Sequence, residues 1–391
     1  MPLHGSKSVK VLLHAIFFFS GITTVLIGQV LPILAKHFSL SDLEVSYFFP
    51  AQFAGSITGT VITSRFGRRN NHFASAVLGT VLMATGILLM NSSVFGACLG
   101  GFAVNGIGVG MTLASINLLT LKMNPERSAT ALSVINFCWG LGAIVSKPFV
   151  DAFGTQDTLG ATTYVLAVPL LIGAILLLPK AGGGSRFEAT GVSVDLGATP
   201  IWRTTAAWLI ALFNFIHVGF ESGIGGWLTT YTGRVPGEPL TRWLSPILLY
   251  FLFFVAGRGF APVLFRFLNE NKMLLLGLVI VLTGMIVLLT ATSVTLLSLG
   301  AGIAGFGTSW VFPTNVSRFY QTFGPTATRN ATPLFICGTL GAAGTTWLIG
   351  FISTQTGNLR SGMYLLLVAV IVLITLQIGL GRRRDRQPSR S

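Results

Sequence analysis

Long apolar runs, separated by short polar segments, follow one another along the whole chain. Each run is about 20 residues long, the length of an α-helix that crosses a hydrocarbon layer of ~30 Å. Twelve such helices are predicted, near residues 11–36, 44–64, 73–92, 94–121, 128–151, 160–179, 204–231, 243–266, 273–292, 294–318, 328–353 and 362–380. The pattern therefore predicts an all-α protein that crosses a membrane many times.

The longest polar interruption lies near the middle of the chain and contains three consecutive glycines, Gly182 to Gly184. It divides the apolar runs into two sets of six. The predicted organisation is a six-helix N-terminal bundle at 1–180, a cytoplasmic linker at 181–203, a six-helix C-terminal bundle at 204–381 and a basic cytoplasmic tail at 382–391.

The two predicted halves resemble each other in sequence. Ala54-Gly55-Ser56 pairs with Ala256-Gly257-Arg258, and the glycine-rich runs 106–110 and 302–307 lead to Asn117 and Asn315. Two similar six-helix halves are typical of transporters built from parallel repeats. In such proteins the substrate site lies near the bilayer midplane between the halves, where the first, fourth, seventh and tenth helices are expected to line it.

Composition supports the membrane prediction. The chain is 52% hydrophobic and 9% charged, whereas roughly 25% of residues are charged in soluble proteins. The formal net charge of +14 would suggest nucleic acid in a soluble domain, but most basic residues, Arg318 among them, are assigned to termini and loops on one side. The exceptions are Lys36, Lys147, Arg234, Arg242, Arg258 and Arg360.

This asymmetry predicts a multi-pass protein of the inner, cytoplasmic membrane with both termini in the cytoplasm. The expected environment is the lipid bilayer, anionic lipid included, and no nucleic acid. The first apolar run is long enough to remain as a helix, so no cleaved signal peptide is expected. The three cysteines, Cys98, Cys138 and Cys337, lack paired spacing, so neither a disulfide framework nor a metal site is predicted.

Glu221 is an acidic residue in the middle of the apolar run 204–231. A charge at that depth costs several kcal/mol and usually has a function. Asn214, His217 and Glu221 are spaced by three and four residues, which places them on one helix face. The sequence predicts a proton-coupling site of Glu221, Arg258 and His217, beside a helix segment weakened by glycines at 223–226. A structural ion pair with Arg258, and a packing role for His217, are the alternatives.

Residues 60–69, TVITSRFGRR, resemble the G-x-x-x-D-R-x-G-R-R signature of the major facilitator superfamily, with Thr60 and Ser64 in place of the first Gly and the Asp. The resemblance implies the major facilitator fold of twelve transmembrane helices. It also implies a cytoplasmic gate formed by Arg65, Gly67, Arg68 and Arg69. In the family the Asp helps to lock this gate, so a weaker lock is expected here. A run of arginines is also a plain topology anchor.

Within that superfamily, three stretches resemble the fucose permease-like group of proton-coupled sugar importers and relatives of the sodium-dependent glucose transporters. These are residues 218–227 followed by Tyr231, residues 312–314, and Trp139 with the segment that follows it. The same group is also resembled by two shorter segments, Gln52 to Gly55 and Gly257-Arg258. The resemblance implies transport of a sugar.

Polar and aromatic residues in the apolar runs fit such a substrate. Carboxamides satisfy adjacent hydroxyls in pairs, and indole or phenol rings cover the apolar face of a sugar. The predicted substrate-binding residues are Gln29, Asn105, Asn117, Asn136, Trp139, Asn214, Trp227, Tyr231, Trp310 and Asn315. Asparagines also bridge membrane helices, and Trp and Tyr also form interfacial belts, so packing remains the alternative for each.

Two charged motifs are predicted to be structural. Ser41-Asp42-Leu43-Glu44 has the pattern of a capping box, and Lys147 lies four residues before Asp151, as in a local ion pair. The chain has no nucleotide-binding motif, and its fifth apolar run lacks the Gly-Pro pattern of drug antiporters.

The sequence therefore predicts a secondary transporter rather than an enzyme. It is expected to import a small polar solute, a hexose-type sugar, by alternating access with proton coupling. The alternatives are proton-driven efflux of drugs or metabolites, a sodium-coupled or uncoupled sugar carrier, and a membrane receptor without transport. No cofactor is expected, and the chain is expected to act as a monomer.

Overall fold

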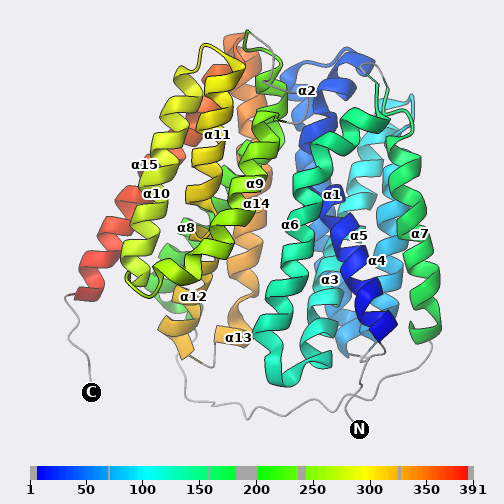
Figure 1. The fold of residues 1–391 in the computed structure, drawn as a ribbon, viewed down its shortest axis with the longest axis horizontal. Coiled ribbons are helices and arrows are strands. Elements are labelled where there is room, and N and C mark those ends of the chain that lie inside the picture. Colours follow the sequence, from blue (N-terminus) through cyan, green and yellow to red (C-terminus); the bar gives the residue numbers. More distant parts are fainter. Residues whose placement is uncertain are drawn as a thin grey trace. The chain divides into compact units, whose positions relative to one another are not determined.

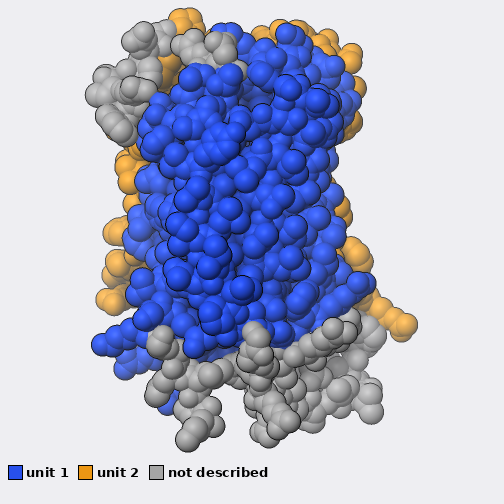
Figure 2. Space-filling view, turned by 90° about the vertical axis from the view of Figure 1, so that its right-hand side faces the viewer, with its two compact units in different colours: residues 1–192 blue, residues 193–391 orange. Residues whose placement is uncertain are grey.

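The computed structural model describes residues 7–68, 71–155, 158–181, 201–236, 244–324 and 327–385. All regular secondary structure in these residues is helical. The chain divides into two compact units, unit 1 at residues 1–192 and unit 2 at residues 193–391, coloured separately in Figure 2. Most of the predicted linker, and the predicted tail from residue 386 on, lie outside the described residues.

Unit 1 contains a bundle of long helices that lie side by side (Figure 1). Its helices are α1 (Lys7–Phe38), α2 (Asp42–Ser46), α3 (Phe48–Arg68), α4 (His72–Leu89), α5 (Phe95–Met123), α6 (Ser128–Phe153) and α7 (Thr162–Ala181). Helix α5 packs against both α3 and α4, and α1 packs along α6.

Unit 2 repeats this arrangement. Its helices are α8 (Thr205–Thr232), α9 (Pro246–Leu264), α10 (Glu270–Thr290), α11 (Val294–Thr308), α12 (Val311–Phe323), α13 (Ala327–Asn330), α14 (Thr332–Thr356) and α15 (Leu359–Asp385). Helix α11 packs against α9 and α10 as α5 does against α3 and α4, and α8 packs along α14.

Eleven helical segments of the described chain are long and apolar enough to cross a membrane, with α11 and α12 counted as one. The predicted all-α membrane fold is confirmed. The predicted second span corresponds to α3, which has 21 residues but is not among the eleven. Its polar residues account for this, since it contains Ser56, Thr58, Thr60, Thr63, Ser64 and Arg65.

The two motifs predicted to be structural are confirmed. The Ser41 hydroxyl accepts a hydrogen bond from the Glu44 backbone N–H (3.3 Å), and the Glu44 carboxylate accepts one from the Ser41 N–H (2.8 Å) at the start of α2. This second bond holds the pKa of Glu44 below its usual value. In α6, Lys147 forms an ion pair with Asp151.

Close backbone contacts at glycines define how the repeats correspond. A Cβ added at Gly106 of α5 would lie 2.0 Å from the carbonyl oxygen of Gln52 in α3, and one at Gly305 of α11 would lie 2.2 Å from that of Tyr250 in α9. Gln52 therefore corresponds to Tyr250. The same alignment pairs Gly257 with residue 59, so the predicted pairing of Gly257 with Gly55 is one helical turn out of register.

The helix predicted at 294–318 is interrupted, which corrects the sequence prediction. Helix α11 ends at Thr308 and α12 begins at Val311. Pro313 has no N–H to donate to the carbonyl of Ser309, four residues earlier. In contrast, α8 continues through Gly223, Gly225 and Gly226 to Thr232, so the predicted weak point is an unbroken helix.

Candidate functional site

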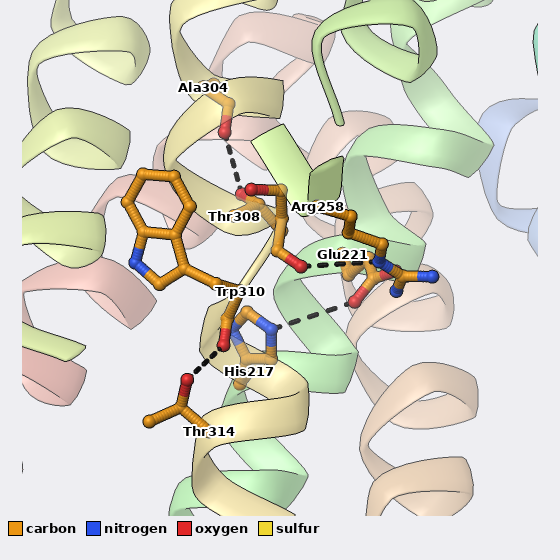
Figure 3. Close-up of polar contacts among 8 residues, drawn as sticks. His217, Glu221, Arg258, Ala304, Thr308, Trp310 and Thr314 are labelled. Carbon is orange, nitrogen blue, oxygen red and sulfur yellow. Dashed lines mark hydrogen bonds and ion pairs between the residues drawn. The ribbon is translucent and has the colours of Figure 1, made fainter. Parts of the chain in front are cut away.

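Glu221, His217 and Arg258 lie beside the interruption between α11 and α12 (Figure 3). Helix α8 supplies the first two residues, one turn apart. The Nε2 atom of His217 lies 3.7 Å from a carboxylate oxygen of Glu221, and the two side chains are 2% and 24% exposed. The shared helix face predicted from their spacing is confirmed.

Arg258 reaches the site from α9. Its Nε donates a hydrogen bond to the carbonyl oxygen of Ser309 (3.3 Å), and its guanidinium lies 4.2 Å from the centre of the Phe254 ring. The neighbouring Gly257 allows α9 to approach this point closely, since a Cβ there would lie 2.3 Å from the Ser309 hydroxyl. Arg258 thus occupies the backbone acceptor that the helix interruption leaves available.

The charges of Glu221 and Arg258 interact through space. Among the described residues, no direct ion pair joins these two groups. The structural ion pair that the sequence offered as an alternative is therefore not formed in this conformation. A carboxylate whose cationic neighbour is close but bound elsewhere can exchange a proton as the neighbour moves.

The described residues contain no group of three or more His, Cys, Asp or Glu side chains that could hold a metal ion. A proton needs only Glu221 itself. Sodium would need additional oxygen ligands, such as backbone carbonyls at an interrupted helix.

A second polar cluster lies in unit 1, where three helices meet. Asn136 of α6 donates to the side-chain oxygen of Asn117 in α5 (3.4 Å). One turn further along α6, the indole N–H of Trp139 donates to the hydroxyl of Thr24 in α1 (3.4 Å). All four side chains are half-buried. The structure therefore brings together Asn117, Asn136 and Trp139, with Thr24 as a neighbour that the prediction lacked.

Gln29 and Asn105 are buried more deeply, at 2% and 0% exposure. Asn105 donates to the Met83 carbonyl of α4 (3.3 Å) and accepts from Gln52 of α3 (3.5 Å). Gln52 was absent from the predicted site, although an amide in an apolar helix is a visible signal. Its Oε1 is buried without a hydrogen-bond partner in the described structure.

Four predicted substrate residues of unit 2 instead join helices to one another. Trp227 and Asn214 of α8 donate to the carbonyls of Thr346 and Leu334 in α14 (2.9 Å each). Trp310 donates to the Met273 carbonyl of α10 (2.9 Å). The Tyr231 hydroxyl accepts from Arg360 of α15 (3.0 Å). The structure places these four side chains in separate contacts between helices.

Asn315 belongs to a buried network around Arg318. Arg318 donates to the side-chain oxygens of Asn315 and Gln377, the latter at 2.8 Å, and lies over the ring of Phe213 at 4.9 Å. Asn315 also donates to the Ile210 carbonyl of α8 (3.3 Å). The prediction that Arg318 lies in a polar loop is wrong, because α12 continues past it and buries it to 5% exposure.

The predicted gate residues lie at the end of α3. Arg65 is exposed there, and Gly67 and Arg68 complete the helix. Arg69 lies outside the described residues, and the side chain of Arg68 does so too.

Comparison with known proteins gives a consistent result. A family model described as the Major Facilitator Superfamily matches residues 13–327. A glucose/mannose transporter, GlcP of Bacillus subtilis, is 21% identical over 388 residues, which cover 95% of each chain. The sodium-dependent glucose transporter 1 of Xenopus laevis is 22% identical over 365 residues, covering 85% of this chain and 73% of its own.

Solved structures resemble the whole chain in fold. A peptide transporter, POT, in complex with alafosfalin superposes with a TM-score of 0.77 at 13% identity, covering 98% of this chain and 97% of its own. The Escherichia coli fucose:proton symporter FucP superposes with a TM-score of 0.60 at 17% identity, covering 97% and 98%. At these identities the likeness concerns the fold alone.

Proposed function

Because the chain belongs to the Major Facilitator Superfamily, we propose that it is a secondary transporter that imports a hexose-type sugar by alternating access, driven by protons. The observation that carries this proposal is the position of Glu221. Its carboxylate lies inside α8 beside His217 and within the field of Arg258, whose side chain is bound to a backbone carbonyl. An ionisable group in such a span is expensive to maintain without a function.

The substrate class rests on two observations. Asn117, Asn136 and Trp139 offer two carboxamides and an indole at one half-buried place, which suits adjacent hydroxyls and the apolar face of a sugar ring. The proteins named as glucose or glucose/mannose transporters match this chain along 85% and 95% of its length.

Sodium coupling is the second candidate, and the name of the Xenopus relative supports it. The proton is preferred because Glu221 can bind it alone, and the neighbouring cation and imidazole can change the proton affinity of the carboxylate. Transport of a small metabolite other than a sugar is a further candidate, since a protein named as a gentisate transporter of Corynebacterium glutamicum is 22% identical over 82% of this chain. The distribution of its basic residues supports a place in the cytoplasmic membrane with both termini inside. We further propose that the protein acts as a monomer.

The test is uptake into proteoliposomes. Labelled glucose, mannose, fucose and gentisate are offered with an inward proton gradient, with an inward sodium gradient at constant pH, or with neither. The proposal expects accumulation of one or more hexoses under the proton gradient alone. Accumulation under the sodium gradient alone would show that the coupling ion is sodium and not the proton. Gentisate transport without any sugar transport contradicts the substrate class.

A further inference from the structure

The interruption between α11 and α12 contains a backbone carbonyl, that of Ser309, whose helical donor position is occupied by a proline. The amide of Ser309 donates to Phe306 (3.3 Å), and helical bonding resumes with the amide of Thr314 donating to Trp310 (3.1 Å). One of the carbonyls between these two acceptors, that of Ser309, would bond to the amide of residue 313 in a continuous helix. Proline occupies that position and has no N–H. A carbonyl inside a membrane protein needs another donor.

Arg258 provides that donor. Its Nε bonds to the Ser309 carbonyl at 3.3 Å while the ring of Phe254 supports the guanidinium from one side at 4.2 Å. Figure 3 shows this bond beside the carboxylate of Glu221. Arg258 therefore has two potential partners close together, a neutral carbonyl and a carboxylate whose charge depends on a proton.

The other ionisable groups around Glu221 are few. His217 of α8 is next to it, and Tyr250 of α9 is buried within its field. Helix α11 contains no ionisable residue. On the remaining helices packed against α8, the ionisable residues with described side chains are Arg318 and Tyr320 (α12), Cys337 (α14), Arg360 and Tyr364 (α15), and Arg203 before α8. Among the described side chains, Arg258 is the cation whose charge acts on Glu221.

We infer that Pro313 is a positioning residue for proton coupling, because the Ser309 carbonyl that it leaves without a helical donor competes with Glu221 for Arg258. This inference rests on the proposed coupling role of Glu221. With Glu221 protonated, Arg258 stays on Ser309 and stabilises the interruption. When Glu221 loses its proton, the carboxylate attracts Arg258, and the Ser309 carbonyl loses its donor. Protonation and deprotonation of Glu221 thereby change the hydrogen bonding at the junction of α11 and α12.

The test is Pro313→Ala. Alanine restores an N–H that can bond to the Ser309 carbonyl, so Arg258 is released to pair with ionised Glu221. Protonation then requires more acid, and the pH of half-maximal gradient-driven uptake should move down by about one unit. Sugar exchange at saturating concentration and low pH should stay within about twofold of the parent. Pro169→Ala in α7, which also removes a proline inside a helix, is the matched control and should leave the pH profile unchanged.

Phe254→Leu provides an independent variant, since loss of the ring also weakens the hold on Arg258 at Ser309. It should shift the profile in the same direction. The double variant Pro313→Ala with Glu221→Gln should exchange sugar at the rate of Glu221→Gln alone, because the titrating group is gone. Parent-like pH profiles for both Pro313→Ala and Phe254→Leu, with accumulation abolished by Glu221→Gln, would overturn this inference and leave the proposed function intact. Normal accumulation by Glu221→Gln would overturn the proposed coupling site as well.

Discussion

At the scale of single residues, a substitution of Glu221 tests whether transport and energy coupling can be separated. Glutamine keeps the size and hydrogen-bonding capacity of a protonated glutamate but cannot ionise. Glu221→Gln should therefore retain sugar exchange within about threefold and lose gradient-driven accumulation. Counterflow and proton-driven uptake in the same proteoliposomes measure the two activities. Glu126→Gln, at an exposed position of unit 1, is the control and should behave as the parent.

Trp139 is the aromatic residue that we expect to contact the sugar. Trp139→Phe removes the N–H that binds Thr24 and part of the ring area, together worth about 1.4 kcal/mol of sugar binding. The sugar concentration for half-maximal exchange should rise about tenfold with little change in maximal rate. Trp208→Phe, on the exposed side of α8, should leave both unchanged. A tenfold fall in maximal rate at unchanged affinity would show that Trp139 serves the conformational change instead.

The sequence identified which residue types matter but could not assign their partners. Trp139, Trp227 and Trp310 are alike as tryptophans in apolar helices. Only the structure shows that Trp139 is half-buried beside a hydroxyl, whereas the other two are fully buried against backbone carbonyls. Those carbonyls belong to helices distant in the sequence, and the periodicity of hydrophobic positions within one helix cannot identify such partners. The burial of Arg318 was not predicted for a related reason, because its buried amide partner Gln377 lies on α15.

At the scale of helices, the irregularity lies at a different place from the predicted one. Glycines at 223, 225 and 226 suggested a weak helix, yet α8 is continuous. Pro313 lies in a run predicted to be continuous, yet the chain breaks there. The energies explain this, since a glycine inside a helix costs about 1 kcal/mol and packing can offset it, whereas proline removes a hydrogen bond and clashes, costing about 3 kcal/mol.

Close packing between helices makes Gly106 sensitive to one added methyl group. Gly106→Ala would place Cβ 2.0 Å from the Gln52 carbonyl, so α3 and α5 must separate. Overpacking of this kind costs about 1 to 3 kcal/mol, and the melting temperature in detergent should fall by several degrees. Gly100→Ala in the same helix meets no atom within 4 Å and should be neutral or slightly stabilising. Equal melting temperatures for both variants would show that the α3 and α5 contact is looser than in this structure.

At the scale of the whole molecule, the repeats share packing but not chemistry. The glycine contacts pair Gln52 with Tyr250, and the same register pairs Thr60 with Arg258. Arg258, the cation of the proposed coupling site, therefore has a neutral counterpart in unit 1. The sequence predicted the all-α membrane fold because helix length and apolar runs depend only on local composition. It could not predict the exact register or the coupling geometry, because both depend on contacts between helices.

The predicted cytoplasmic gate can be tested at this scale. In the family signature an Asp helps to close the gate, and Ser64 replaces it here, so closure should depend on Arg65 meeting helix C-termini and their partial negative charge. Arg65→Ala should lower the rate of conformational exchange about tenfold, equal to about 1.4 kcal/mol. Substrate affinity should stay nearly unchanged because Arg65 is not among the predicted substrate residues. Initial uptake rates at saturating sugar, together with equilibrium binding, distinguish the two effects.

Arg266→Ala, an exposed arginine just after α9, controls for loss of positive charge on the same predicted side. A large loss of affinity with intact turnover would instead place Arg65 at the substrate.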